Sequence, residues 1–277
     1  EGRDTTFLSN MSDADKLVTY NFSQSFFATD YVPDPKKVES TAQTLKDVKD
    51  DLTSCQVLYE NQVYNRAAYM MQQAVEKVCK AYGRFLFGLT DTEARRKVSH
   101  KSPMVFVLGV KKPEMQKFVK LMKRFHPELK TDIDVLADVV REKKEEFNVS
   151  SRESIKQFLN VIDRIDERMR QQEVGELIGM LMAFVAESKG KDMTDEQATQ
   201  MGDLFLDLFR DFLNLYAMSA FTYGHDQDAR YRENDNDQSQ YTAELGLIQH
   251  LPDLMYRVHK AVDSMQIMLD LHTTKST

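Results

Sequence analysis

Residues 64–83, YNRAAYMMQQAVEKVCKAYG, decide the fold class because their apolar side chains recur every three or four positions. Residues at these separations share one face of a helix, so the spacing predicts an amphipathic helix. The apolar face consists of Ala67 or Ala68, Met71, Ala74, Val75, Val78, Ala81, Tyr82 and Phe85. The small alanine side chains on this face allow a partner helix to approach closely. We therefore expect this helix to pack inside a helical bundle.

The polar face of the same helix carries a stripe of mostly cationic side chains. Its members are Arg66, Gln73, Lys77, Lys80 and Arg84. Glu76 lies beside the stripe, at the separation of four residues that allows it to pair with Lys80. Such a stripe is most often a solvated face with ordinary ion pairs. The alternative is a face that contacts phosphate groups.

The composition indicates an almost entirely helical protein. Only ten glycines and six prolines interrupt 277 residues, and a hydrophobic content of 42% is enough for a substantial core. The two cysteines, Cys55 and Cys79, are too few for a disulfide framework. No apolar run approaches the roughly 18 residues of a membrane span, and the start, EGRDTTFLSN, does not read as a signal peptide. We expect a soluble, cytoplasmic protein.

The net charge of −7 argues against a surface that coats long stretches of nucleic acid, because neutralising many phosphates requires clustered Lys and Arg. It is compatible with a local basic pocket. The chain has no HxxxH, ExxH or CxxC pattern, which are the spacings typical of helical metal sites. We therefore expect neither a metal nor another cofactor.

Breaks in the helical pattern divide the chain into four expected segments. These are an N-terminal arm (1–40), the first half of a bundle (41–113), a charged helical insertion (114–193) and the second half of the bundle (194–277). Prolines end the arm, and a helix is expected from Ser40. The apolar run VFVLGV after Pro103 fits either a helix or a strand. Thr194 and Gln197 fit a capping box that begins a long buried helix.

The order of residues from Asp51 to Ala81 resembles the HEPN domain (higher eukaryotes and prokaryotes nucleotide-binding). Two further motifs of that family follow in order, Ser99-His100 and then Ala229-Arg230-Tyr231 with Tyr241-Thr242. The resemblance covers about residues 45–110 and 205–270. It implies an all-α fold, an antiparallel up-and-down four-helix bundle elaborated by the insertion and the arm. It also implies a homodimer.

Many HEPN domains are metal-independent endoribonucleases of toxin–antitoxin or defence systems, with an Arg and a His four to six residues apart near the last helix. The His accepts or donates protons at the 2′-hydroxyl, and the Arg stabilises the developing phosphate charge. Here the expected region contains His225, but the nearest upstream arginine is Arg210, which is too distant. The pair with the family's spacing is Arg95 and His100, which lies in the connector after the second helix.

Three hypotheses follow for the function. In the first, the protein binds a nucleotide or RNA phosphate without the usual RNase motif, through Gln73, Lys77, Lys80, Arg84, His100, His225, Arg230 and Tyr231. In the second, it is a metal-independent endoribonuclease in which Arg95 and His100 are catalytic. In the third, it is a ligand-free helical scaffold that binds a protein partner through residues 114–193.

Overall fold

The computed structural model describes residues 35–86, 88–110, 152–170, 194–223, 225 and 241–273. Every regular element in these ranges is a helix, which confirms the all-α prediction. The elements are α3 (Pro35–Glu60), α4 (Tyr64–Phe85), α5 (Asp91–Glu93), the π-helix η1 (Ala94–Val98), α6 (Pro103–Val110), α9 (Arg152–Met169), α11 (Asp195–Tyr223) and α13 (Gly246–Thr273). Residues 1–34 of the expected arm lie outside the described ranges.

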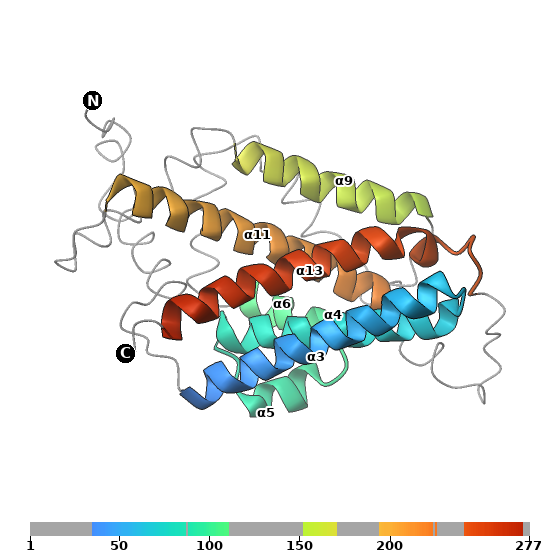
Figure 1. Ribbon diagram of the computed structural model, residues 1–277, viewed down its shortest axis with the longest axis horizontal. Coiled ribbons are helices and arrows are strands. Elements are labelled where there is room, and N and C mark those ends of the chain that lie inside the picture. Colours follow the sequence, from blue (N-terminus) through green and yellow to red (C-terminus); the bar gives the residue numbers. More distant parts are fainter. Residues whose placement is uncertain are drawn as a thin grey trace.

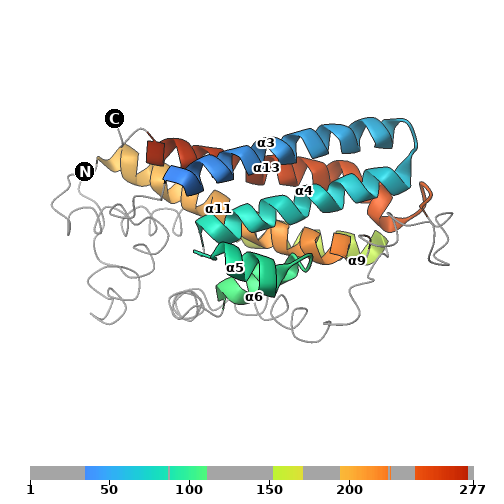
Figure 2. The same cartoon turned by 90° about the horizontal axis from the view of Figure 1, so that it is seen from below.

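The helices α3, α4, α11 and α13 lie side by side, and the chain reverses its direction from each to the next (Figure 1). α4 packs against α3, α11 and α13, while α13 also packs against α3 and α11. Seen from below, α5 and α6 lie on the far side of α4 from α3 and α13 (Figure 2). The expected antiparallel four-helix bundle is therefore present.

The apolar face predicted for α4 is buried, with Phe85 half-buried at its end. The hydroxyl of Tyr82 donates to the carbonyl oxygen of Ala261 in α13 at 2.9 Å, and both residues are in the core. Two polar residues of α4, Gln72 and Glu76, are buried as well. The periodicity alone did not predict their burial.

One helix begins earlier than the sequence indicated, and another settles an alternative that the sequence left open. α3 begins at Pro35, five residues before the expected Ser40, because proline fits the first turn of a helix, where its missing N–H is not needed. The run after Pro103 is the helix α6. The ring of Phe106 in α6 packs edge-on against Phe212 and Tyr216 of α11, with centroid distances of 5.2 and 5.7 Å.

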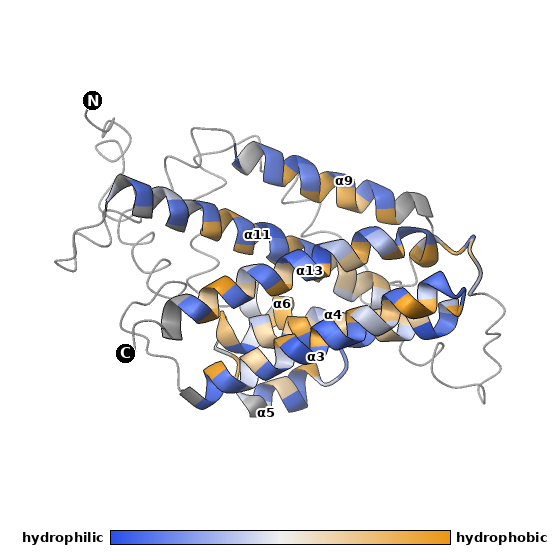
Figure 3. Cartoon of the chain, in the orientation of Figure 1, coloured by the Kyte–Doolittle hydropathy of each residue, from blue (hydrophilic) through white to orange (hydrophobic). Residues whose placement is uncertain are grey.

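α9 lies within the segment expected as an insertion, and it packs against both α11 and α13. Its apolar face, Ile155, Leu159, Ile162 and Ile165, is buried. Figure 3 shows this apolar side turned toward the other helices. α9 therefore extends the core of the bundle. The segment boundaries near residues 40, 113 and 193 stay predictions.

Among the described residues, no helix combines the length and the apolar content that would be needed to cross a membrane.

Candidate phosphate-binding site

A buried carboxylate on α4, that of Glu76, is the centre of the candidate site. Lys80 donates to its Oε1 at 2.5 Å, and Gln72 donates to its Oε2 at 3.1 Å. The Nδ1 atom of His100 lies 3.3 Å from the same carboxylate. Gln73 extends the network by donating to Oε1 of Gln72 at 2.6 Å. Three residues of the predicted set, Gln73, Lys80 and His100, are therefore linked through Glu76.

The environment of Glu76 determines its charge. Burial raises the pKa of this carboxyl, but the Lys80 ammonium and the hydrogen bonds from Lys80, Gln72 and His100 outweigh it, so the pKa lies below its ordinary value. Glu76 is therefore ionised at neutral pH. A buried carboxylate in that state requires hydrogen-bond donors around it, and Lys80 and Gln72 supply them.

His100 reaches α4 because a short structured connector turns the chain back. Thr90 and Glu93 form a capping box, in which the Glu93 N–H donates to Thr90 Oγ1 and the Thr90 N–H donates to Glu93 Oε2. The π-helix η1 follows and ends at Val98, and its C-cap residue Ser99 has a φ of 49°, in the left-handed region. This residue redirects the backbone, so that His100 lies beside Glu76.

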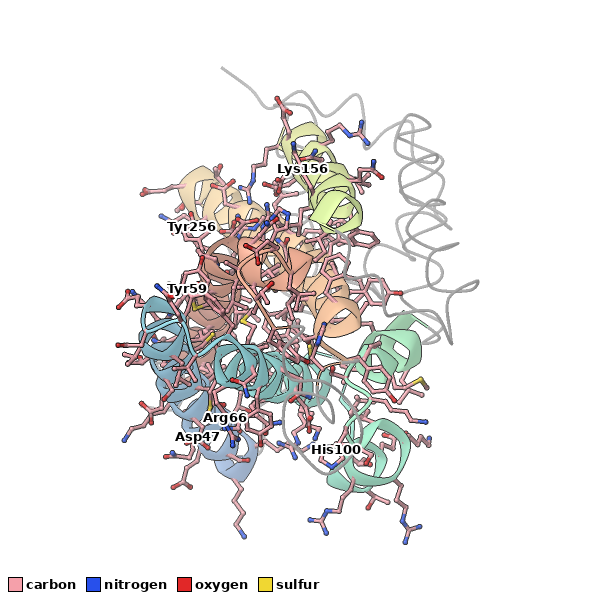
Figure 4. The ribbon with its side chains drawn as sticks, turned by 90° about the vertical axis from the view of Figure 1, so that its right-hand side faces the viewer. Asp47, Tyr59, Arg66, His100, Lys156 and Tyr256 are labelled. Carbon is pink, nitrogen blue, oxygen red and sulfur yellow. The ribbon has the colours of Figure 1, made fainter. Side chains whose placement is uncertain are left out.

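The segment 94–101, here called the basic turn, exposes several cations around His100. Arg95, Arg96, Lys97 and Lys101 are all exposed. Lys97 pairs with Glu93 at 2.9 Å, whereas the guanidinium groups of Arg95 and Arg96 have no ion-pair partner within the described ranges. Figure 4 shows His100 at one edge of the molecule and Lys156 of α9 at the opposite edge. The turn that carries His100 therefore also carries four exposed cationic side chains.

The remaining members of the polar stripe on α4 have different surroundings. Lys77 donates to Asp51 of α3 at 2.6 Å, with 35% and 17% of the two side chains exposed, so its ammonium joins the two helices. Arg84 is half-buried in the last turn of α4, and Arg66 is exposed. The predicted stripe is thus divided between interhelical pairing and the network around Glu76.

His225 lies at a different position along the bundle axis from Glu76. Its Nδ1 is 2.8 Å from the hydroxyl of Tyr241, and the two rings meet edge-on. Cys79 Sγ lies 3.8 Å from the Leu215 carbonyl oxygen, which sets the register of α4 against α11. At about 1.5 Å per residue, His225 lies roughly 10 Å along the bundle axis from the level of Glu76. Arg230 and Tyr231 lie outside the described residues.

The sequence indicated the pair of Glu76 and Lys80 but not the central position of Glu76. Gln72, Glu76 and Lys80 are spaced four residues apart, which was visible as a pattern. The burial of Glu76 depends on the connector folding over it, and spacing does not report that contact. Within the described ranges, no group of three or more His, Cys, Asp and Glu residues is arranged to hold a metal ion.

No curated protein and no solved structure matches this chain. The sequence model of the HEPN domain matches residues 42–94, which include most of α3, all of α4 and the capping box before the basic turn. At the level of that family, the match indicates a function related to nucleotides or RNA, or of the RNase type. Residues 42–94, within the first half of the bundle, are therefore similar to the HEPN domain family, as the sequence indicated.

Proposed function

We propose that the protein binds the phosphate of a nucleotide or of RNA at the basic turn and the adjoining side of α4. The observation that carries this proposal is the contact of His100 with Glu76. The His100 side chain is 66% exposed, yet it is held by a carboxylate that is only 9% exposed and that also holds Lys80. A surface side chain fixed in this way loses less conformational entropy when it binds a ligand.

Two guanidinium groups that have no ion-pair partner among the described residues provide the phosphate contacts. Arg95 and Arg96 present planar donors that match the geometry of phosphate oxygens. They lie on the basic turn, which carries four cationic side chains and no carboxylate and directly follows Glu93, in a chain whose net charge is −7. A patch of this size suits one to three phosphates. The logarithm of the binding constant should then fall with the logarithm of salt concentration with a slope of about −2 or smaller in magnitude.

Fluorescence anisotropy with a labelled oligouridine tests the proposal. The variant Arg95→Gln/Arg96→Gln removes two cations at the site, and Lys156→Gln/Arg164→Gln removes two exposed cations from α9 at the opposite edge (Figure 4). Exposed ion pairs contribute up to about 1 kcal/mol each, so the first variant should weaken binding about tenfold. The second should change it less than twofold. Equal effects of the two variants, or no binding by the wild type, would refute the proposal.

A second candidate function, metal-independent cleavage of RNA, is favoured by the same contact. A carboxylate that orients an imidazole is a recurring arrangement in general acid–base catalysis, and Arg95 lies on the turn that carries His100. Its test is cleavage of RNA in the presence of EDTA. His100→Gln should abolish cleavage and His225→Gln should preserve it; intact RNA after long incubation with the wild type would eliminate this candidate.

Several expectations from the sequence remain proposals at this stage. They are the homodimer, a protein partner bound through residues 114–193, a cytoplasmic location and a role in toxin–antitoxin or defence systems. Sedimentation of the full chain at several concentrations tests the homodimer directly. If the protein neither binds nor cleaves RNA, the scaffold hypothesis with a protein partner takes precedence.

A further inference from the structure

The basic turn carries a serine hydroxyl on its exposed side. Ser99 is exposed and is the C-cap residue of η1, so it lies where regular structure ends. Figure 4 shows the next residue, His100, at an edge of the molecule. Ser102, three residues after Ser99, is only 2% exposed. Exposed turns of this kind are where modifying enzymes reach a folded chain. Of the two serines, Ser99 is therefore the one that an enzyme can reach.

The residues before Ser99 form a charge pattern that an enzyme can recognise. Arg96 and Lys97 stand three and two residues before it, and both side chains are exposed. No other serine or threonine in the sequence has basic residues at both of these positions. A serine kinase whose substrate groove carries carboxylates at the matching positions selects such a segment by charge complementarity. Ser99 thus combines accessibility with a specific charge pattern.

A kinase binds its substrate as an extended segment, so η1 has to open before the transfer. η1 is five residues long, and only its first and last residues, Ala94 and Val98, are buried. Short segments with few buried side chains open at the lowest free energies in a folded protein. The opening is therefore local, and the four helices of the bundle stay packed.

We propose that Ser99 is a phosphorylation site for a serine kinase with this charge preference, and that its phosphate occupies the cations of the basic turn and excludes the ligand. The inference rests on the phosphate binding proposed above, because the same cations serve both. In the transfer, Oγ of Ser99 forms a bond to the γ-phosphorus of ATP. The bond from that phosphorus to the bridging oxygen breaks, ADP leaves with its electron pair, and a carboxylate of the kinase accepts the hydroxyl proton.

The charge of the phosphate explains the exclusion of the ligand. The basic turn carries four cationic side chains. A phosphoserine adds a charge of about −1.5 to −2 and three acceptor oxygens, so about half of that positive charge is neutralised. The new phosphate also belongs to the same segment, which gives it a high effective concentration relative to a free ligand. Affinity for oligouridine should fall about tenfold, as expected for Arg95→Gln/Arg96→Gln, which also removes two charges.

Phosphorylation of the folded protein tests the site. The full chain is incubated with ATP and the catalytic subunit of cyclic-AMP-dependent protein kinase, a serine kinase that selects upstream basic residues, and the products are mapped by mass spectrometry. One phosphate is expected at Ser99 and none at Ser102. Ser99→Asn should take up no phosphate at this position, and asparagine tolerates the left-handed φ.

The role of the charge pattern is tested by the rate of the same reaction. Arg96→Gln/Lys97→Gln removes the two cations that the kinase recognises and should slow the transfer about tenfold. Lys156→Gln/Arg164→Gln removes two exposed cations from α9 and should leave the rate within twofold of the wild type.

The effect on the ligand is measured by fluorescence anisotropy with labelled oligouridine, after the ATP has been removed. Wild-type protein treated with kinase and ATP is compared with protein treated with kinase alone and with phosphorylated protein that a phosphatase has restored. Binding should weaken about tenfold only in the first sample. Ser99→Asn taken through the same reactions should bind equally with and without ATP treatment.

The outcomes separate this inference from the proposal on which it rests. Absence of phosphate at Ser99, or equal rates for wild type and Arg96→Gln/Lys97→Gln, would overturn the inference and leave phosphate binding intact. Phosphate at Ser99 with unchanged oligouridine binding would also overturn it. Failure of the unmodified protein to bind oligouridine would overturn the proposed function and the exclusion together. Stoichiometric phosphate at Ser99, with a loss of binding that the phosphatase reverses, would establish the inference.

Discussion

Replacing Arg257 by methionine should loosen α9 from the bundle and lower the stability of the protein. Arg257 on α13 is only 13% exposed and donates to both carboxylate oxygens of Asp163 on α9, at 2.7 and 2.8 Å. It also donates to Asn214 of α11 at 2.8 Å and pairs with Asp253 within α13. One side chain thus connects three helices. Methionine retains the apolar stem and the helix propensity but removes every donor.

The expected loss of stability depends on how well water can replace Arg257 at each of its hydrogen-bond partners. Asn214 is 2% exposed, so its side-chain oxygen loses a donor in a buried place, at a cost of about 1–3 kcal/mol. Asp163 and Asp253 are 53% and 44% exposed, so water replaces the guanidinium and each adds only about 0–1 kcal/mol. The sum is about 1–5 kcal/mol, with a middle value of about 3 kcal/mol, in the free energy of unfolding.

Urea denaturation of wild type and Arg257→Met measures this difference, and hydrogen exchange reports whether the amides of α9 lose protection first. Arg164→Met is the control, because Arg164 is exposed on the same helix as Asp163 and has no ion pair within the described ranges. It should change stability by less than about 0.5 kcal/mol. A double-mutant cycle with Asp163→Ala should show a coupling of about 1 kcal/mol. The reasoning fails if Arg257→Met is as stable as Arg164→Met.

Three further predictions concern the core. Burial raises the pKa of Asp211 from 3.8 to about 6 against the opposing effect of Arg210, so the contribution of Asp211 to stability is complete below about pH 4 and is lost as the pH rises through 6. In denaturation curves, Asp211→Asn should therefore gain stability relative to the wild type as the pH rises from 4 to 7. A difference in stability that stays constant over this range would contradict the prediction. Burial raises the pKa of Cys55 to about 12 and that of Cys79 well above its ordinary value, so a thiol reagent at pH 8 should label both only after unfolding. A Cβ on Gly83 would lie 2.8 Å from side-chain atoms of Leu89 and of Val105, which is in α6. Gly83→Ala should therefore destabilise the protein by about 1–3 kcal/mol in the same urea assay. A neutral effect would contradict this and would show that α6 readily moves away from α4.

The periodicity of the sequence predicted the helices more reliably than it predicted their partners. The apolar face of α4 was predicted residue by residue because a helix repeats its faces regularly, whatever surrounds it. α9 was expected as part of a helical insertion, but its packing on α11 and α13 depends on contacts such as Asp163 with Arg257, 94 residues apart. No local pattern reports a pairing at that separation.

The candidate site was predictable to the same extent. The pair of Glu76 and Lys80 was expected because four residues separate two opposite charges on one helix. The link from Glu76 to His100 spans 24 residues and depends on the turn at Ser99, so the sequence indicated both residues without connecting them. Lys77 appeared equivalent to Lys80, and only the position of α3 assigns its ammonium to Asp51.

The hydrogen bond from Tyr82 to Ala261 joins residues that are 179 positions apart, so forming the bundle closes a very long loop of chain. The entropy of closure grows only with the logarithm of loop length, and halving this loop would change the free energy of closure by about 0.6 kcal/mol. The two halves of the bundle therefore place little thermodynamic restriction on the length of sequence between them. Chain added between the helices α6, α9 and α11 therefore costs little free energy of closure while the pairing of α4 with α13 is maintained. Folding rate is affected differently, because contacts this distant in sequence form slowly.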